Sequence, residues 1–175
     1  MRAGRDTANL VTVAVGEGGR VRLLNRTGAT HLIADIAGYY SPEAPGRFVP
    51  VEPTRFLDTR AGVGGAPIPT TAGGFVQVRV AGARGVPGDA VAAVLNLTGT
   101  GAGASTDVRA YPVDVGGVPQ VSNLNLSRGD TRANLAIVPL GSAGRLQLLN
   151  KSGALNLIGD LTGYMVDRPA APPAP

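Results

Sequence analysis

The sequence predicts an all-β fold, an antiparallel β-sandwich of jelly-roll-like form with a partial tandem repeat, or alternatively a closed barrel. Apolar and polar residues alternate along short segments, which is the period of a strand. The chain has 26 Gly and 14 Pro in 175 residues, and these separate the segments as turns do. No segment combines a 3.6-residue apolar period with helix caps, so many strands without helices imply two packed sheets or a barrel.

The strongest feature of the sequence is a repeated segment. Residues 4–39 and 129–164 align without a gap, and about half of the aligned residues are identical. Self-similarity of this kind is the mark of a repeat architecture, so the chain is predicted to contain one structural segment twice.

Each copy is predicted to form a meander of three antiparallel strands. In the first copy, alternating runs cover residues 10–15 and 20–25, and residues 31–40 form a third apolar run. The glycine-rich residues 16–19 and the Asn-Arg-Thr-Gly sequence at 25–28 provide the two turns between them.

The middle of the chain is predicted to add further strands. A new segment begins at residue 47, and alternating or apolar runs cover 75–81, 91–98, 107–113 and 120–126. Apolar residues on the predicted strands are expected in the core, namely Val94, Leu95, Leu97 and the equivalent pair Leu23 and Leu148.

The repeat also predicts the domain organisation. Residues 1–40 are interpreted as the C-terminal third of a truncated unit, 41–46 as a linker, 47–166 as a complete unit and 167–175 as a Pro/Ala-rich tail. The chain is expected to begin within a unit and without a signal peptide, and residues 4–128 could equally form a permuted unit.

Residues 4–40 are not expected to stay isolated. Three strands alone are marginal in water, and their edges invite pairing. The segment is therefore predicted to join the sheets of residues 47–128, in competition with 129–164, or to pair with another chain, so self-association through residues 4–40 is expected.

Composition excludes several classes of function. The net charge of +4 comes almost entirely from scattered Arg residues, which favours solvent-facing strands over a nucleic-acid surface and leaves a weak attraction to anionic polymers. No apolar run approaches the ~20 residues of a membrane span. The absence of Cys excludes disulfides and thiolate metal sites.

Catalytic and metal sites are not predicted. His31 is the single histidine, and Asn156 takes its place in the second copy, which argues against a catalytic or metal role. Asp35 and Asp160 are equivalent residues of the two copies, so structural roles are favoured over a pair of glycosidase carboxylates. We expect a chain that is not an enzyme and holds no cofactor.

Asp58 lies between Arg55 and Arg60, and this spacing predicts an ion-paired turn anchor. The alternative is one carboxylate of a calcium site, for which the sequence offers no acidic cluster. Four Asn-X-Ser/Thr sequences match the N-glycosylation pattern and are interpreted as turn chemistry.

Ligand binding is the main functional alternative. The chain has seven aromatic residues and no Trp, fewer than a flat carbohydrate platform usually uses. The candidate residues of a smaller ligand site are Tyr39, Tyr40, Tyr111 and Arg109, and Tyr164 could also contribute. Packing at a strand end is the favoured interpretation of the tyrosines.

A set of short motifs resembles a known repeat module. These are Arg-Phe-Leu-Asp-Thr-Arg at 55–60, Val-Ala-Gly at 80–82 with Gly-Val-Pro at 85–87, Val-Leu-Asn-Leu-Thr at 94–98, Ser-Asn-Leu-Asn at 122–125, Ala-Asn-Leu at 133–135 and Asp-Leu-Thr-Gly-Tyr at 160–164. In this order they resemble the module of secreted actinobacterial proteins, which occurs in tandem or beside extracellular hydrolases. The resemblance covers residues 47–166 and, as a partial copy, 4–40. It implies an extracellular or cell-surface all-β module, and no reaction.

Two functions follow as hypotheses. The first is a non-enzymatic extracellular repeat module that acts as a structural spacer or adhesive unit. The second is a module that binds glycans, such as cell-wall polysaccharide, or an anionic wall polymer.

Overall fold

The computed structural model describes residue 4 and residues 6–167. Within them lie eight β-strands and two single-turn 3-10 helices, η1 (Glu17–Gly19) and η2 (Ser142–Gly144). The strands are β1 (Gly46–Asp58), β2 (Phe75–Arg79), β3 (Ala90–Thr100), β4 (Thr106–Pro112), β5 (Leu124–Leu126), β6 (Thr131–Pro139), β7 (Arg145–Asn150) and β8 (Asn156–Asp167).

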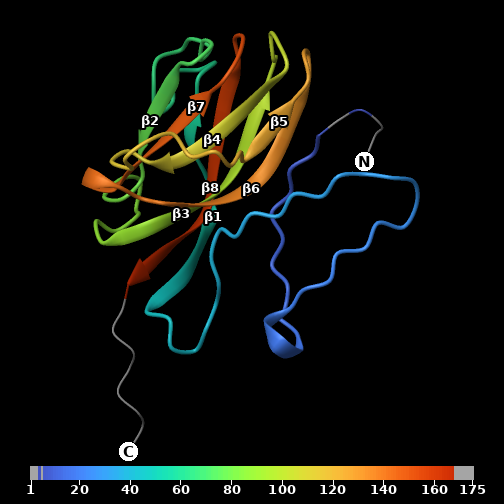
Figure 1. Cartoon of the computed structure of the whole chain (residues 1–175). Helices are drawn as coiled ribbons and strands as arrows, with labels where there is room; N and C mark the ends of the chain where they lie inside the picture. Colours follow the sequence, from blue (N-terminus) through green and yellow to red (C-terminus); the bar gives the residue numbers. More distant parts are fainter. Residues whose placement is uncertain (1–3, 5, 168–175) are drawn as a thin grey trace, which may run out of the picture.

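The strands form two antiparallel four-stranded sheets packed face to face (Figure 1). One sheet has the order β1-β8-β3-β6 and the other β2-β7-β4-β5. Successive strands alternate between the sheets from β1 to β4 and again from β5 to β8, which is the arrangement of a jelly roll. The predicted all-β sandwich is confirmed.

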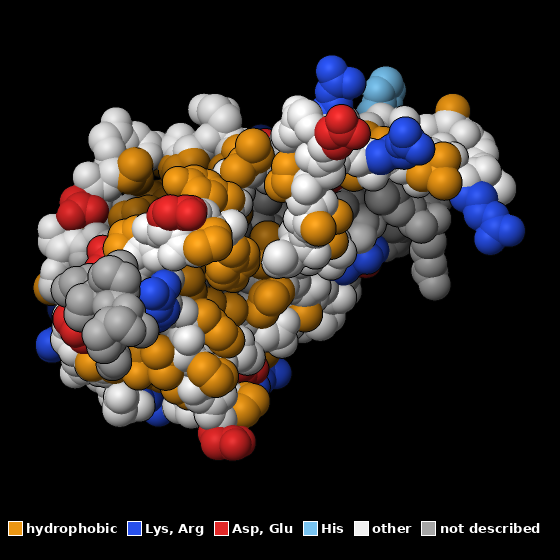
Figure 2. Space-filling model, turned by 90° about the horizontal axis from the view of Figure 1, so that it is seen from below, with side chains coloured by type: hydrophobic (Ala, Val, Ile, Leu, Met, Phe, Trp, Pro, Cys, Tyr) orange, Lys and Arg blue, Asp and Glu red, His pale blue; other side chains and the backbone are white. Residues whose placement is uncertain are grey.

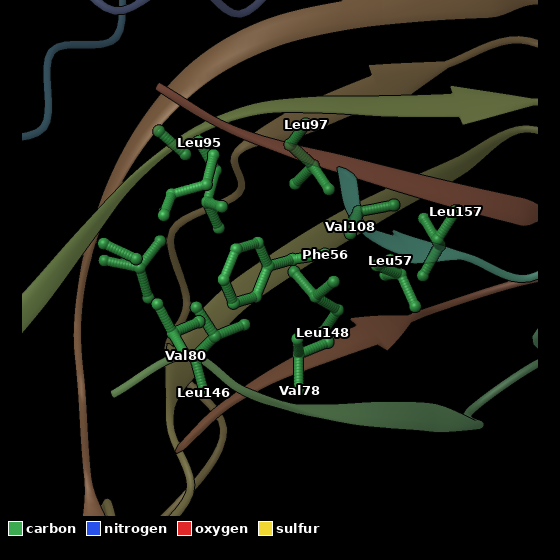
Figure 3. Close-up of a cluster of buried hydrophobic side chains, with 14 of the residues drawn as sticks. Phe56, Leu57, Val78, Val80, Leu95, Leu97, Val108, Leu146, Leu148 and Leu157 are labelled. Carbon is green, nitrogen blue, oxygen red and sulfur yellow. The ribbon is translucent and has the colours of Figure 1, made fainter. Parts of the chain in front are cut away.

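The core lies between the sheets and is filled from both (Figure 3). On β7, side chains alternate strictly between buried and partly exposed, so that Leu146 and Leu148 point inward with at most 1% of their surface exposed. The core predictions for Val94, Leu95, Leu97 and Leu148 are confirmed.

The predicted meander is wrong. β6 pairs with β3, β7 pairs with β2 and β4, and β8 pairs with β1 and β3, so the last three strands do not pair with one another. Their connections cross from one sheet to the other, because each strand buries its apolar face only against the opposite sheet. Alternation in the sequence specifies the buried face of a strand, and it does not specify its neighbours.

Residues 6–40 form no strand (Figure 1). The three strands predicted there, and the core position predicted for Leu23, are wrong: Leu23 is 59% exposed. Among the described residues, the segment adds no strand to either sheet. Leu10 is half-buried, and its amide donates a hydrogen bond of 3.0 Å to Asn134 Oδ1 of β6. The strands that would pair with it already hold β6, β7 and β8.

The turns of the first copy nevertheless match those of the second. η1 and η2 occupy equivalent positions, and each is enclosed by an equivalent bridge, Gly16 with Arg20 and Gly141 with Arg145. The Asn25 Nδ2 atom donates to the Gly28 carbonyl over 2.8 Å, as Asn150 does to Gly153. Local sequence therefore sets the turns, whereas strands form only where partners exist.

The sandwich extends from β1 to β8. β1 begins at Gly46, the last residue of the linker predicted at 41–46, and β8 ends at Asp167, the first residue of the predicted tail. The strand expected at 120–126 is reduced to Leu124–Leu126, the length over which it pairs with β4. Residues 168–175 of the predicted tail lie outside the described residues.

Candidate functional site

A strained turn follows β2. The Val86 amide donates to the Ala83 carbonyl, and both central residues have positive φ, 49° at Arg84 and 84° at Gly85. Glycine adopts this conformation freely, whereas a residue with a Cβ pays about 1–2 kcal/mol. An arginine held in such a conformation, where glycine would fit without strain, points to a role for its side chain.

The Arg84 guanidinium lies over an aromatic ring. Its central carbon is 5.7 Å from the centroid of Phe56, a β1 residue with 3% of its surface exposed. This is cation–π geometry, which holds a positive charge at the surface directly above the core.

A hollow of about 260 Å³ opens beside this pair. Its floor is apolar and its rim is polar, and the residues that line it are Val51, Glu52, Thr54, Phe56, Arg84, Gly85, Val86 and Leu161. The register of β1 against β8 shifts between Pro50 and Thr54, so β1 bulges along one wall of the hollow.

The hollow has the chemistry of a small binding site. Arg84 offers donors suited to a carboxylate, phosphate or sulfate, and the half-buried Val51 offers apolar surface to a ring or methylene group. Glu52 is the one carboxylate in the lining that the structure describes, so the arrangement has no paired acid and base.

A second polar cluster stabilises the fold. Asp58 is buried at the end of β1 and bonds Arg60 through Nε (2.9 Å) and Nη2 (2.8 Å) and Arg55 through Nη1 (3.1 Å). Arg55 also makes a bidentate pair with Asp160 of β8, 2.8 Å from Nε to Oδ1 and 3.1 Å from Nη2 to Oδ2. Hydrogen bonds from the Arg60 side chain are the main cause that lowers the pKa of Asp58 from 3.8 to about 2.

Asn150, whose side chain is fully buried, forms a third network. Its Nδ2 donates to the carbonyls of Thr70, Thr71 and Gly153, and its Oδ1 accepts from the Thr106 hydroxyl over 2.7 Å. Thr106 in turn accepts from the amide of Ser152. The interpretation of the Asn25 and Asn150 sequences as turn chemistry agrees with these bonds.

The predicted ligand residues do not form one site. Tyr39 and Tyr40 are 82% and 61% exposed on the N-terminal segment, whereas Tyr111 on β4 is 5% exposed and accepts a hydrogen bond from Gln147 Nε2. Arg109 donates to Asp107 Oδ2 and to the Pro119 carbonyl, both over 2.8 Å. Tyr111 and Arg109 are thus bound within the fold.

The other candidate residues lie apart. His31 and Asp35 are exposed on the N-terminal segment, which projects from the sandwich (Figure 2), and Asp160 is paired with Arg55. Among the described residues, no three His, Asp or Glu side chains are grouped closely enough to hold a metal ion. The described part of the chain also contains no helix with the length and hydropathy of a membrane span.

Sequence reasoning missed Arg84. A signal was present in the Ala-Arg-Gly-Val sequence at 83–86, where a bulky residue precedes the glycine of a two-residue turn. Recognising it requires knowing that the turn places both residues at positive φ and that Phe56 lies beneath the side chain.

Comparison with known proteins does not assign the chain to a family. The chain matches no protein-family model, and a search of curated proteins finds no match to it.

Proposed function

We propose that this chain is a non-enzymatic extracellular repeat module that acts as a structural spacer or adhesive unit. The observation that carries the proposal is the segment that occurs twice with the same turn geometry, as in proteins built from serial copies of one unit. The extracellular location rests on the resemblance to the module of secreted actinobacterial proteins. The buried Asp58 and Asn150 networks support a structural use of the polar residues.

The hollow beside Arg84 favours a second candidate function. A strained, exposed arginine over an aromatic ring, next to apolar surface, suits a glycan or an anionic cell-wall polymer. In this alternative the module tethers its neighbours to the wall through the hollow.

Binding to wall polysaccharide, anionic wall polymer and a glycan array distinguishes the two candidates. A spacer shows no binding above background. A wall-binding module binds, and Arg84→Gly reduces its affinity at least about tenfold while raising stability by about 1 kcal/mol through release of the strained turn.

Arg84→Gln is a second test variant, and Arg128→Gln is its matched control. The first removes the charge and keeps a side chain at the strained position, and the second removes an exposed arginine from a different turn. Binding that is equally sensitive to both variants would indicate general attraction to Arg and contradict a site in the hollow. Hydrolytic or metal-dependent activity that disappears in His31→Ala would contradict the non-enzymatic proposal.

A further inference from the structure

Residues 6–42 correspond in sequence to three strands of the sandwich, and none of these three strands pairs with another of the three. In the sandwich, the equivalent residues 131–167 form β6, β7 and β8, and every strand that pairs with them belongs to β1–β4. Because β6, β7 and β8 do not pair with one another, the arrangement of the sandwich gives residues 6–42 no strand pairs among themselves or with a second copy of the same segment.

We call β6, β7 and β8 the closing strands, because they complete the two sheets. Gly163 on β8 lies where β1 approaches closely. A Cβ at this position would collide with the Phe48 ring and lie 2.9 Å from the Val49 carbonyl oxygen, both on β1. A Cβ at Gly144 would likewise collide with Ala81, and one at Gly153 would lie 2.8 Å from the Ala104 amide nitrogen. Gly163 on β8, Gly144 in η2 and Gly153 in the turn between β7 and β8 therefore allow close approach by residues that precede them in the unit.

The first copy keeps these glycines without the contacts. Gly19, Gly28 and Gly38 stand at the equivalent positions, and a Cβ on any of them would meet no atom within 4 Å. Gly19 and Gly28 have φ of 73° and 69°, which is a local reason for glycine, but Gly38 is not among the positive-φ residues. The backbone at Gly38 therefore does not itself require glycine. An aromatic ring packed against Gly38, as Phe48 of β1 is packed against Gly163, would require it.

Apolar side chains of the first copy follow the same plan. Val13, Val21, Leu23 and Leu32 are 50–59% exposed, and their equivalents Val138, Leu146, Leu148 and Leu157 are buried to 1% exposure or less. Exposure of several large apolar side chains on one segment marks an interaction surface.

Two polar residues define what a partner must offer. Asp35 corresponds to Asp160, which pairs with Arg55 of β1, and Asn25 corresponds to Asn150, whose bonds reach the carbonyls of Thr70 and Thr71 and the Thr106 hydroxyl. A partner suited to residues 6–42 presents an arginine on its first strand and carbonyl and hydroxyl groups at the corresponding edge.

We propose that residues 6–42 are a strand donor that completes a second sandwich, and that the acceptor is a β1–β5 portion of like sequence without closing strands of its own. The corresponding portion of this chain, residues 46–128, is already closed by residues 131–167. The proposal rests on the repeat and its contacts, and it stands whether or not the module binds glycans.

The donor also indicates how the acceptor differs from residues 46–128. Glu17 replaces Ser142, which donates to the carboxylate of Asp114 through its amide and hydroxyl groups. An acidic residue at the Asp114 position would repel Glu17, so we expect a neutral residue there in the acceptor.

The test adds an acceptor to the full chain. Residues 46–128 with Asp114→Asn are joined directly ahead of Gly4, as Arg128 precedes Gly129 in the complete unit. In the extended protein, amides of residues 10–36 are expected to exchange at least about 100-fold more slowly than in the unextended chain, because they enter sheet ladders. Unchanged exchange of residues 10–36, while residues 131–167 remain protected, would overturn the proposal.

Gly38→Val and Ala37→Val form a matched pair in the extended protein. Gly38→Val is expected to abolish the new protection, because Val would collide with the added Phe48 ring. Ala37→Val is expected to preserve it, because the second copy has a β-branched residue, Thr162, at that place. Equal loss of hydrogen-exchange protection in the two variants would contradict the proposed pairing of residues 6–42 with the added strands.

The unextended chain tests the competing occupant. Hydrogen exchange and sedimentation across a range of concentrations are expected to show a monomer with residues 10–36 unprotected. A dimer in which these residues gain protection would show that a second, closed copy is the partner, and would overturn the assignment of an open β1–β5 acceptor.

Discussion

Asp58 shows how one residue joins the end of β1 to its surroundings. Its side chain is 4% exposed and lies between Arg55 and Arg60, and the Arg60 amide donates to it as well over 3.0 Å. Arg55 extends the cluster to Asp160 of β8. Because β1 and β8 are adjacent, the cluster ties the first strand of the sandwich to the last.

Asp58→Asn is expected to lower the free energy of unfolding at pH 7 by about 2 kcal/mol. A carboxylate whose pKa is about 2 when folded and 3.8 otherwise stabilises the fold above pH 4, and this contribution is lost as the pH falls through 2. Urea unfolding of both proteins between pH 2 and 7 measures the effect.

The difference in free energy of unfolding between wild type and Asp58→Asn should therefore decrease steadily as the pH falls from 4 to 2. A gap that stayed constant over this interval would contradict the lowered pKa. Arg128→Gln, which changes an exposed residue outside the cluster, provides the control.

At the scale of elements, the two copies form a natural comparison of one sequence with and without partners. Leu148 on β7 is buried against the opposite sheet, and its equivalent Leu23 is exposed. The strands of the second copy are thus stabilised by their neighbours in the sheets, since the same alternation in the first copy yields extended chain.

Leu148→Ala is expected to lower the free energy of unfolding by about 2–5 kcal/mol, and Leu23→Ala by less than about 0.5 kcal/mol. The first substitution leaves a cavity in the core, whereas the second alters a side chain that is already in water. Chemical denaturation of the two variants measures the difference, and equal losses would mean that residues 6–40 are packed in solution.

Most elements could be predicted from the sequence, but their pairing could not. Alternation located the strands from residue 75 onward and the core positions Leu95, Leu97 and Leu148. It failed at Leu23 because burial needs a partner strand, and a partner is not encoded in the local pattern. Arg84 was missed for a related reason, since its strain and its contact with Phe56 arise from a turn and a strand far apart in sequence.

At the scale of the whole molecule, the chain divides into a closed sandwich and a segment outside it (Figure 1). The buried residues of the main core cluster lie between residues 56 and 161, and Val51 and Tyr164 pack against it. The sandwich is accordingly expected to be as stable alone as in the whole chain.

Removing residues 1–40 is expected to change the free energy of unfolding by less than about 1 kcal/mol, the net value of the Leu10–Asn134 hydrogen bond. Thermal and urea unfolding of residues 41–175 beside the full chain measure this. A loss of several kcal/mol would show that the N-terminal segment packs on the sandwich.

The pairing of Gly46 with Asp167 determines how the sandwich responds to mechanical load. These residues form the outermost pair of the antiparallel β1–β8 ladder, so the chain enters and leaves the sandwich at the same point. Tension between the two ends peels β1 from β8 one residue pair at a time, because the load never falls on all the ladder hydrogen bonds in parallel. A series of such units would yield at low force and act as an extensible element.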